Sequence, residues 1–312
     1  MRLASYRADG RDRIGVSLDG ETLVDLAAAG IATTDLLGVI EAGPEALDRI
    51  AALLRDPPAD ALHGRDAVTW HPPVRRPSKI CCIALNNSAN SERIIAGPRH
   101  PAAFVKPSSA LVGHGGAVEC RADYGRVHPE PELAVVIGRA ARDVSAADAL
   151  DHVFGYTIHN DITSPTMRGE DTFHYRAIHP KAGEPNGVAY VESWVSYPGR
   201  YKCSDTFSPM GPWLVTRDEI ADPHDLRIAC YHDDRLITED NTANLFFKLP
   251  QVIEFLSAYM TLLPGDIVSL GTALKSAAGG AAVQNVDLNR LGGVVSVEIE
   301  GIGRLSNGVA RR

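Results

Sequence analysis

The sequence predicts an α+β fold in which strands outnumber helices. Short apolar runs rich in β-branched residues recur along the chain with Gly and Pro between them, a pattern typical of a mostly β fold that closes on itself. Helical periodicity is confined to a few segments. A proline-rich stretch at 71–77 reads as an extended linker. We therefore expect a small α+β N-terminal domain at 1–72 and a larger, mostly β domain at 73–312.

The N-terminal segment is expected to contain three short strands followed by two helices. Asp19-Gly20 is typical of a hairpin turn between the second and third strands. The first helix is predicted to start at a capping residue, Thr33 or Thr34. The strands are predicted at 3–7, 13–18 and 22–26, and the helices at 34–42 and 44–55. This segment carries no obvious reactive group of residues, so we expect it to give structural support or a dimer contact.

The rest of the chain is predicted to have two helices and one long loop. One helix is expected at 146–153, after Ser145, and another at 249–260, with Pro250 in its first turn. The segment from 167 to 200 is polar and rich in Gly, Pro, His and Tyr. A loop of this length in a compact domain is often a lid or a binding loop.

Composition excludes several classes of partner. The chain has 312 residues with a formal net charge of −8, which argues against nucleic acid or an anionic membrane surface as a partner. No apolar run approaches the roughly 20 residues that a membrane helix needs. The N-terminal residues do not have the pattern of a signal peptide. The five cysteines include no C-x-x-C pair. These features predict a cytoplasmic protein in a reducing compartment.

Three carboxylates lie at the ends of two strands that the sequence predicts to be buried. Glu130 and Glu132 open the apolar run 133–137, and residues two apart on a strand point to the same face. Asp161 ends a second apolar run at 153–160. Anions held this closely need a cation, a shared proton or water. Oxygen ligands suit a hard ion, so we expect Mg²⁺ or Mn²⁺. The simpler alternative is that the two glutamates are only solvated at a strand start.

With these residues in view, the chain resembles the fumarylacetoacetate hydrolase (FAH) family. The resemblance covers roughly residues 79–308 and rests on short motifs that occur in the family's order. They are Lys79-Ile80-Cys81-Cys82-Ile83-Ala84-Leu85-Asn86, Phe104-Val105-Lys106-Pro107, Glu130-Pro131-Glu132-Leu133-Ala134-Val135-Val136-Ile137-Gly138, Gly155-Tyr156-Thr157-Ile158-His159-Asn160-Asp161, Lys202-Cys203-Ser204-Asp205-Thr206-Phe207, Asn241-Thr242, Pro264-Gly265-Asp266 with Gly271-Thr272, and 299–307. The resemblance implies a mixed β-sandwich roll with a metal inside it, and a homodimer.

The resemblance also implies roles for individual residues. It places the metal ligands at Glu130, Glu132 and Asp161, and the lysines that stabilise an enolate or carboxylate at Lys106 and Lys202. It places substrate contacts at Gly271 and Thr272, and Thr163 follows the aspartate in the family's motif. The alternatives are that the lysines are ordinary surface residues and that Thr272 only forms a tight turn. His128 and His159 each neighbour a proposed ligand; either is a candidate to support it, and His159 is expected to be a buried, hydrogen-bonded histidine.

The chain departs from the family where water and substrate would bind. The lid histidine of the family corresponds to Asn90, which cannot accept a proton in that role; Glu92 lies nearby. The usual substrate-binding arginine corresponds to Pro165, and Arg168 three positions later is a candidate replacement that offers a fork for a carboxylate. His174 and His179 are further candidates for the missing base, although solvated loop histidines are the simpler interpretation.

The sequence therefore predicts a metal-dependent enzyme that acts on a small 2-oxo or β-diketo acid in catabolism. The leading reaction is hydrolysis of a C–C bond, which the family most often performs. Decarboxylation or keto–enol isomerisation is the alternative, and Asn90 favours it because neither needs activated water. A third hypothesis is a catalytically silent protein that binds metal and ligand.

Overall fold

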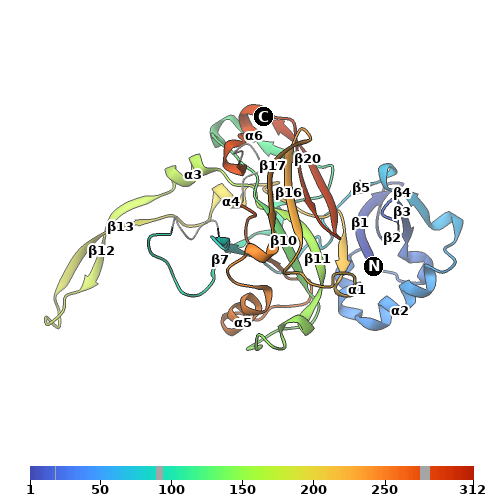
Figure 1. Cartoon of the computed structure of the whole chain (residues 1–312), viewed down its shortest axis with the longest axis horizontal. Helices are drawn as coiled ribbons and strands as arrows, with labels where there is room; N and C mark the ends of the chain where they lie inside the picture. The colour runs from blue at the N-terminus through green and yellow to red at the C-terminus, as the bar shows by residue number, and fades with distance from the viewer. Residues whose placement is uncertain (18, 89–93, 275–281) are drawn as a thin grey trace.

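The computed structural model describes residues 1–17, 19–88, 94–274 and 282–312, and it is a mixed fold dominated by strands (Figure 1). Over these residues most strands belong to one large sheet and a second, smaller sheet, and two short strand pairs lie outside both. The large sheet runs in the spatial order β4 (Leu62–Gly64), β3 (Thr22–Asp25), β2 (Arg11–Ser17), β1 (Arg2–Ala8), β15 (Leu214–Thr216), β11 (Val153–Asn160), β10 (Pro131–Ile137), β18 (Ile267–Ser269), β6 (Ile80–Ala84) and β7 (Ala102–Lys106), with β5 (Thr69–Trp70) paired to β1. The predicted α+β, mostly β class is confirmed.

The second sheet packs against the centre of the first. Its order is β17 (Arg235–Asn241), β16 (Arg227–His232), β19 (Val294–Ile299), β20 (Gly303–Arg311) and β9 (Val118–Cys120). β10 and β11 contact β16 and β19 across the interface, and one continuous apolar core joins the two sheets. Because both faces of β10 and β11 are covered, every residue of these strands is buried, which explains their unbroken apolar runs. A short pair, β8 (Leu111–Val112) and β14 (Ser208–Pro209), lies outside both sheets.

The predicted N-terminal strands and helices are present. The turn after β2 is held by Asp19, whose carboxylate accepts hydrogen bonds from the backbone of Glu21 at 2.9 Å and Thr22 at 2.8 Å. The helices are α1 (Leu36–Ala42) and α2 (Pro44–Leu53). The predicted threonine cap was wrong: Asp35 caps α1 by accepting from Leu37 N at 2.9 Å. An aspartate at this position satisfies a backbone donor that the helix leaves open.

The N-terminal strands continue the large sheet. β1 pairs with β15, with Leu3 opposite Leu214, and an apolar cluster contains residues from both predicted domains, including Ile14 and Ala134. The domain boundary near residue 72 therefore stays a prediction: the chain passes through irregular structure there, while the sheet is continuous across it.

Two elements differ from the sequence prediction in the larger part of the chain. The helix predicted at 146–153 is only a single 3₁₀ turn, Ala149–His152. The segment 167–200 is not an irregular loop. It contains an antiparallel hairpin, β12 (Phe173–Pro180) and β13 (Val188–Val195), which stands away from the body of the molecule (Figure 1). Tyr175, Ala177 and His179 occupy every second position of β12, a spacing that fits a strand. No sequence signal indicated that the hairpin would pair with no other strand.

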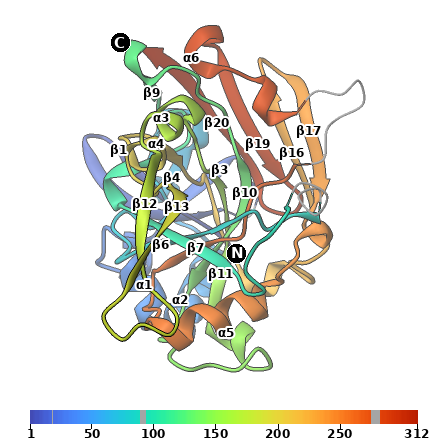
Figure 2. The same ribbon diagram turned by 90° about the vertical axis from the view of Figure 1, so that its left-hand side faces the viewer.

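The remaining helices are short except for one. They are α3 (Pro165–Glu170), α4 (Arg200–Cys203), α5 (Leu249–Tyr259) and α6 (Leu288–Leu291), and α5 confirms the helix predicted at 249–260. Figure 2 shows α5 lying along one end of the strands of the large sheet. Among the described residues, no helix is long and apolar enough to cross a membrane.

Candidate active site

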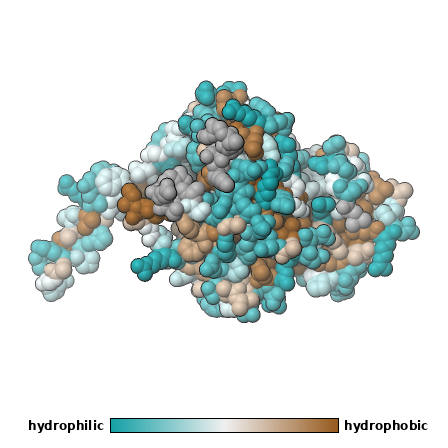
Figure 3. All heavy atoms as spheres, in the orientation of Figure 1, coloured by the Kyte–Doolittle hydropathy of each residue, from teal (hydrophilic) through white to brown (hydrophobic). Residues whose placement is uncertain are grey.

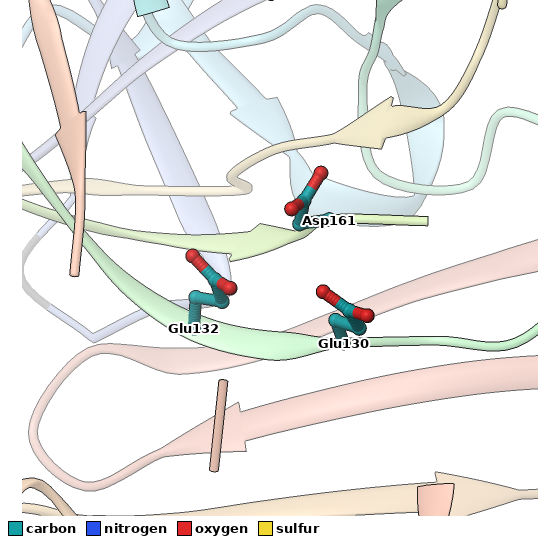
Figure 4. A group of neighbouring side chains, drawn as sticks. All are labelled: Glu130, Glu132 and Asp161. Atoms are coloured by element: carbon teal, nitrogen blue, oxygen red, sulfur yellow. The ribbon is translucent and has the colours of Figure 1, made fainter. Parts of the chain in front are cut away.

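The three predicted ligand carboxylates converge at one end of β10 and β11. The two strands are antiparallel with Pro131 opposite Asn160, so the start of one meets the end of the other. Two hydrogen bonds hold the start of β10 against the end of β11: Asp161 N donates to Glu130 O, and Glu130 N donates to the side-chain oxygen of Asn160, both at 2.9 Å. Figure 4 shows Glu130, Glu132 and Asp161 turned toward a common space. One oxygen from each lies within 4.8 Å of the others.

This carboxylate triad is short of positive charge. Burial, together with the neighbouring carboxylates of Asp161 and Glu130, raises the pKa of Glu132 to about 8. Burial also works against ionisation of Asp161 and Glu130, yet nearby lysines hold both pKa values low. Buried oxygens that converge with excess negative charge are the donor set that a hard divalent cation prefers. The residues present therefore fit the predicted Mg²⁺ or Mn²⁺.

Two lysines neutralise part of this charge. Lys106 is fully buried; its ammonium donates to Asp161 and, at 2.8 Å, to Phe207 O. Lys202, on α4, donates to Glu130 at 2.7 Å and to Asp161. Burial alone would lower the pKa of Lys202, but the carboxylates of Asp161 and Glu130 raise it well above its usual value. The alternative that these are surface lysines is excluded for both.

A third strand, β18, supports Glu132 from the other side. Ser269 donates its hydroxyl proton to Glu132, and Gly271 N donates to the same oxygen at 3.2 Å. Because Ser269 gives its proton away, its oxygen accepts from His159 Nδ1, 2.7 Å distant. Burial lowers the pKa of His159 to about 3, so the ring stays neutral. Sequence reasoning missed Ser269, and only the pairing of β10 with β18 could have indicated it.

The loop after β18 also reaches the triad. Thr272 Oγ1 donates toward Glu132 at 3.0 Å and toward Glu130 at 3.2 Å. On the opposite side, His128 Nε2 lies 3.1 Å from Glu130 Oε1, so it supports the ligand carboxylate, as one of the sequence alternatives held. His128 Nδ1 is shielded from solvent and has no hydrogen-bond partner among the described residues.

The triad forms the floor of a cavity of about 420 Å³. Of the predicted substrate-binding residues, Thr163, Arg168 and Thr272 line it, whereas Gly271 contributes only its backbone donor to Glu132. Lys202 also lines the cavity, but Lys106 does not and lies behind Asp161. The wall also contains residues that sequence reasoning did not select, because their own side chains carry no charge: Ile83, Ala84, Leu85, Asn86, Phe104, Pro198, Tyr201, Leu274 and Gln284.

The structure does not bring the two candidate histidines of the long segment, His174 and His179, into the cavity. Asn90 and Glu92 lie outside the described residues. His174 and His179 are on the exposed hairpin β12–β13, and neither lines the cavity. His174 instead stacks on Trp194 and bonds Glu192 across the hairpin.

Comparison with known proteins identifies the family to which this chain belongs. The family model described as fumarylacetoacetate (FAA) hydrolase C-terminal matches residues 79–310. The mitochondrial oxaloacetate tautomerase fahd2 of Xenopus laevis is 32% identical over 314 residues, covering 99% of this chain and 90% of that protein. A mitochondrial oxaloacetate tautomerase of Bos taurus is 34% identical over a shorter stretch, 67% of this chain and 60% of that protein.

Solved structures agree over the whole chain. A fumarylacetoacetate hydrolase from the psychrophile Exiguobacterium antarcticum has a TM-score of 0.78 at 30% identity, with 100% of both chains covered. A maleylpyruvate hydrolase from Sphingobium sp. SYK-6, in complex with manganese(II) and pyruvate, has a TM-score of 0.73 at 27% identity and covers 100% of this chain and 99% of that one. These relatives are enzymes of one superfamily, and the chain belongs to the fumarylacetoacetate hydrolase family.

Proposed function

We propose that this protein is a divalent-metal-dependent enzyme that acts on the enol or enolate of a small 2-oxo acid. The observation that carries the proposal is the carboxylate triad, in which Glu132 and Asp161 are buried and Glu130 is partly buried. Two lysines neutralise part of its charge, and it lies on the floor of a cavity large enough for a short acid. Glu130, Glu132 and Asp161 would hold Mg²⁺ or Mn²⁺. When bound there, the ion would supply Lewis acidity toward a ketonic oxygen. The manganese and pyruvate of the maleylpyruvate hydrolase relative support both assignments.

Three basic residues would stabilise charge, position a ligand carboxylate and bind the substrate. Lys202 lines the cavity beside two ligand carboxylates, so its ammonium can stabilise negative charge that develops on the substrate. Lys106 positions Asp161 from behind and does not touch the cavity. Arg168 lines the wall and makes no ion pair with any described residue, which leaves its guanidinium available for a substrate carboxylate.

Hydrolysis of a C–C bond in a β-diketo acid is the leading reaction. The two hydrolase relatives match the whole chain, and their substrates as named are acids of this type. In this reaction water adds to the distal carbonyl, the C–C bond breaks, and the enolate that leaves is protonated to a 2-oxo acid. Thr163 and Thr272 line the cavity where they can orient such a substrate.

Keto–enol tautomerisation or decarboxylation of a 2-oxo acid is the second candidate. In the described part of the cavity wall, the triad supplies all of the carboxylates and His128 the only imidazole. Its Nδ1 is shielded from solvent, so it is poorly placed to activate water. Asn90 cannot serve as that base either. The oxaloacetate tautomerase that aligns with 99% of the chain also favours this reading.

Proton NMR in D₂O separates these reactions in one experiment. Purified protein with Mg²⁺ or Mn²⁺ is mixed with an acylpyruvate and, separately, with oxaloacetate. Release of pyruvate and a carboxylic acid from the acylpyruvate would support hydrolysis. Faster equilibration of the keto and enol forms of oxaloacetate, without new products, would support tautomerisation, and pyruvate formed from oxaloacetate would support decarboxylation.

The silent-protein hypothesis is tested by the same assay. EDTA and the Glu132→Gln variant are the matched controls: EDTA would remove the ion, the variant would remove one of its proposed ligands, and both leave the rest of the cavity wall in place. Turnover that stops in both controls would exclude a silent protein. A rate equal to that of buffer with every substrate would contradict the proposed enzyme.

A further inference from the structure

Three neighbouring strands of the large sheet each contribute one side chain to a hydrogen-bonded chain, here called the relay (His159, Ser269 and Glu132). Glu132 on β10 lies opposite His159 on β11. Ser269 on β18 lies opposite Ala134, two residues further along β10. Residues two apart on a strand share a face. The register of the three strands therefore places the relay on one face of the sheet.

The relay is closed to water. Hydrophilic residues cover much of the outer face shown in Figure 3, where water can satisfy their polar groups. In contrast, His159 and Ser269 are 0% exposed and Glu132 is 2% exposed. An unpaired buried polar group is costly, so each polar atom of the relay depends on a partner from the protein.

The hydrogen bonds of the relay have one favoured direction. Ser269 has a single hydroxyl proton and an ionised Glu132 can only accept, so Ser269 donates to Glu132 and accepts from His159 Nδ1, 2.7 Å distant. His159 then carries its proton on Nδ1, while its Nε2 has no partner among the described residues. The opposite direction would leave an unpaired proton on Nε2 and would also take a hydrogen bond away from Glu132, so it satisfies fewer groups.

Glu132 differs from the other two carboxylates of the triad in the donors that it receives. A lysine ammonium donates to each of the others, Glu130 and Asp161. Glu132 makes no ion pair with a described residue, and its donors are a serine, a threonine and a backbone amide, all of them neutral. Its negative charge is therefore the least neutralised of the three and the most available to a cation.

These donors occupy the two oxygens of Glu132 unequally. Oε2 accepts from Ser269 Oγ and, at 3.2 Å, from Gly271 N, which uses both of its lone pairs. Among the described residues, Oε1 accepts from Thr272 alone, at 3.0 Å, so one lone pair of Oε1 is left for a metal ion. The hydrogen bond from His159 keeps the proton of Ser269 directed at Oε2.

We propose that His159, acting through Ser269, is a positioning residue that restricts Glu132 to a single metal-binding oxygen and thereby selects against Ca²⁺. Ca²⁺ takes roughly six to eight oxygens and often binds both oxygens of one carboxylate, whereas Mg²⁺ requires an octahedral set. A single oxygen from Glu132 suits the octahedral ion and leaves one more position for substrate. This inference rests on the proposed function, in which the triad holds a divalent cation.

Competition titrations of the full chain measure this selectivity without turnover. Mg²⁺ or Ca²⁺ displaces bound Mn²⁺, and the electron paramagnetic resonance signal of free Mn²⁺ gives both dissociation constants. Ser269→Ala is expected to lower the ratio of the Ca²⁺ to the Mg²⁺ dissociation constant about tenfold, because it frees Oε2 of Glu132 for the larger ion. His159→Leu removes the donor to Ser269 and is expected to shift the ratio in the same direction, by about threefold.

Two further variants separate the hydrogen bond from packing. His159→Asn places an amide N–H where Nδ1 donates, so it is expected to restore the wild-type ratio that His159→Leu loses. Thr157→Val is the matched control: Thr157 lies two residues before His159 on β11, and its buried hydroxyl has no hydrogen-bond partner among the described residues. Its ratio should equal that of the wild type.

¹⁵N NMR of the histidine rings in the Mg²⁺-loaded wild type gives a second readout, which a purely structural role would not move. The His159 signals are those missing from His159→Asn, and they are expected to show a proton on Nδ1 and none on Nε2.

Three outcomes would overturn the relay alone: a proton on Nε2 of His159, an unchanged ratio in Ser269→Ala, or a His159→Asn variant that behaves like His159→Leu. A wild type that binds no Mn²⁺ would overturn the proposed function together with this inference, so the two failures are distinguishable.

Discussion

Asp161 is the residue on which most of the site's electrostatics depend. It accepts from both Lys106 and Lys202, whereas Lys202 is the one lysine among the described residues that donates to Glu130. Lys106 is fully buried, and its only acceptors among the described residues are Asp161 and Phe207 O. A buried charge that loses its counter-ion is strongly destabilising, even where the intact pair adds little net stability. Asp161 should therefore matter for folding as well as for metal binding.

Asp161→Asn is expected to lower the free energy of unfolding by about 3–5 kcal/mol, because it leaves Lys106 buried and uncompensated. Urea unfolding in EDTA, followed by tryptophan fluorescence, measures this without any metal contribution. Adding Lys106→Met to Asp161→Asn removes the stranded charge, so the double variant should regain about 1–2 kcal/mol. A double variant no more stable than Asp161→Asn would show that the charge is not the cause.

Arg168→Ala is expected to raise KM at least tenfold with little change in thermal stability, because the side chain is exposed, lines the cavity and has no ion pair to lose among the described residues. Steady-state kinetics on the substrate found by NMR measures the change. Arg55→Ala is the matched control, since Arg55 is also exposed, makes no ion pair with a described residue and does not line the cavity. An unchanged KM would remove Arg168 from the substrate site.

The site residues differ in how well sequence could predict them. Glu130, Glu132 and Asp161 were predictable because carboxylates held together at the ends of buried strands need a cation, a shared proton or water to be stable there. Ser269 was not, because a serine inside an apolar strand carries no signal until the pairing of β10 and β18 is known. The motif placed Lys106 near the metal, but only packing shows that it lies behind Asp161, outside the cavity.

At the scale of elements, the strands that hold the site depend on close backbone approach. A Cβ on Gly155 in β11 would lie 2.2 Å from Val215 O in β15, a separation that no side chain can occupy. β11 carries Asp161 at its end, so any displacement of β11 also moves a ligand carboxylate.

Gly155→Ala is therefore expected to destabilise the protein by about 3 kcal/mol and to weaken metal binding, through strain between β11 and β15. Gly308→Ala in β20 is the matched control: its Cβ would meet nothing within 4 Å, so stability should change by less than about 1 kcal/mol. Chemical unfolding of both variants measures the difference. Equal losses at the two positions would contradict the close approach as the cause.

Elements were predictable where local pattern and tertiary context agree. The N-terminal strands and α5 have clear alternation or amphipathic spacing, and the structure contains them. The prediction of a helix at 146–153 was wrong because the helical part is limited to a four-residue 3₁₀ turn, Ala149–His152, after which β11 begins. The hairpin β12–β13 was mistaken for a loop because its Gly, Pro and His residues obscure the pattern of two paired strands, and these strands have no sheet to join.

For the whole molecule, one continuous sheet connects the N-terminal strands to the strands that carry the triad. The order runs from β1 through β15 and β11 to β10, so the N-terminal unit supports the site through β15 and β11. The second sheet closes the other side, and together the two sheets bury Glu132, Asp161 and both lysines in one place, with Glu130 partly buried beside them. Sequence composition gave no indication of this continuity, because strand order depends on contacts between distant segments.

The carboxylate triad is expected to hold one divalent cation. Titration of Mn²⁺ into the metal-free protein, monitored by the electron paramagnetic resonance signal of free Mn²⁺, tests it without any assumption about substrate. One bound ion per chain is expected for the wild type, with affinity reduced at least 100-fold in Glu132→Gln. No binding by the wild type, or equal binding by the variant, would contradict the assignment of Glu130, Glu132 and Asp161 as a metal centre.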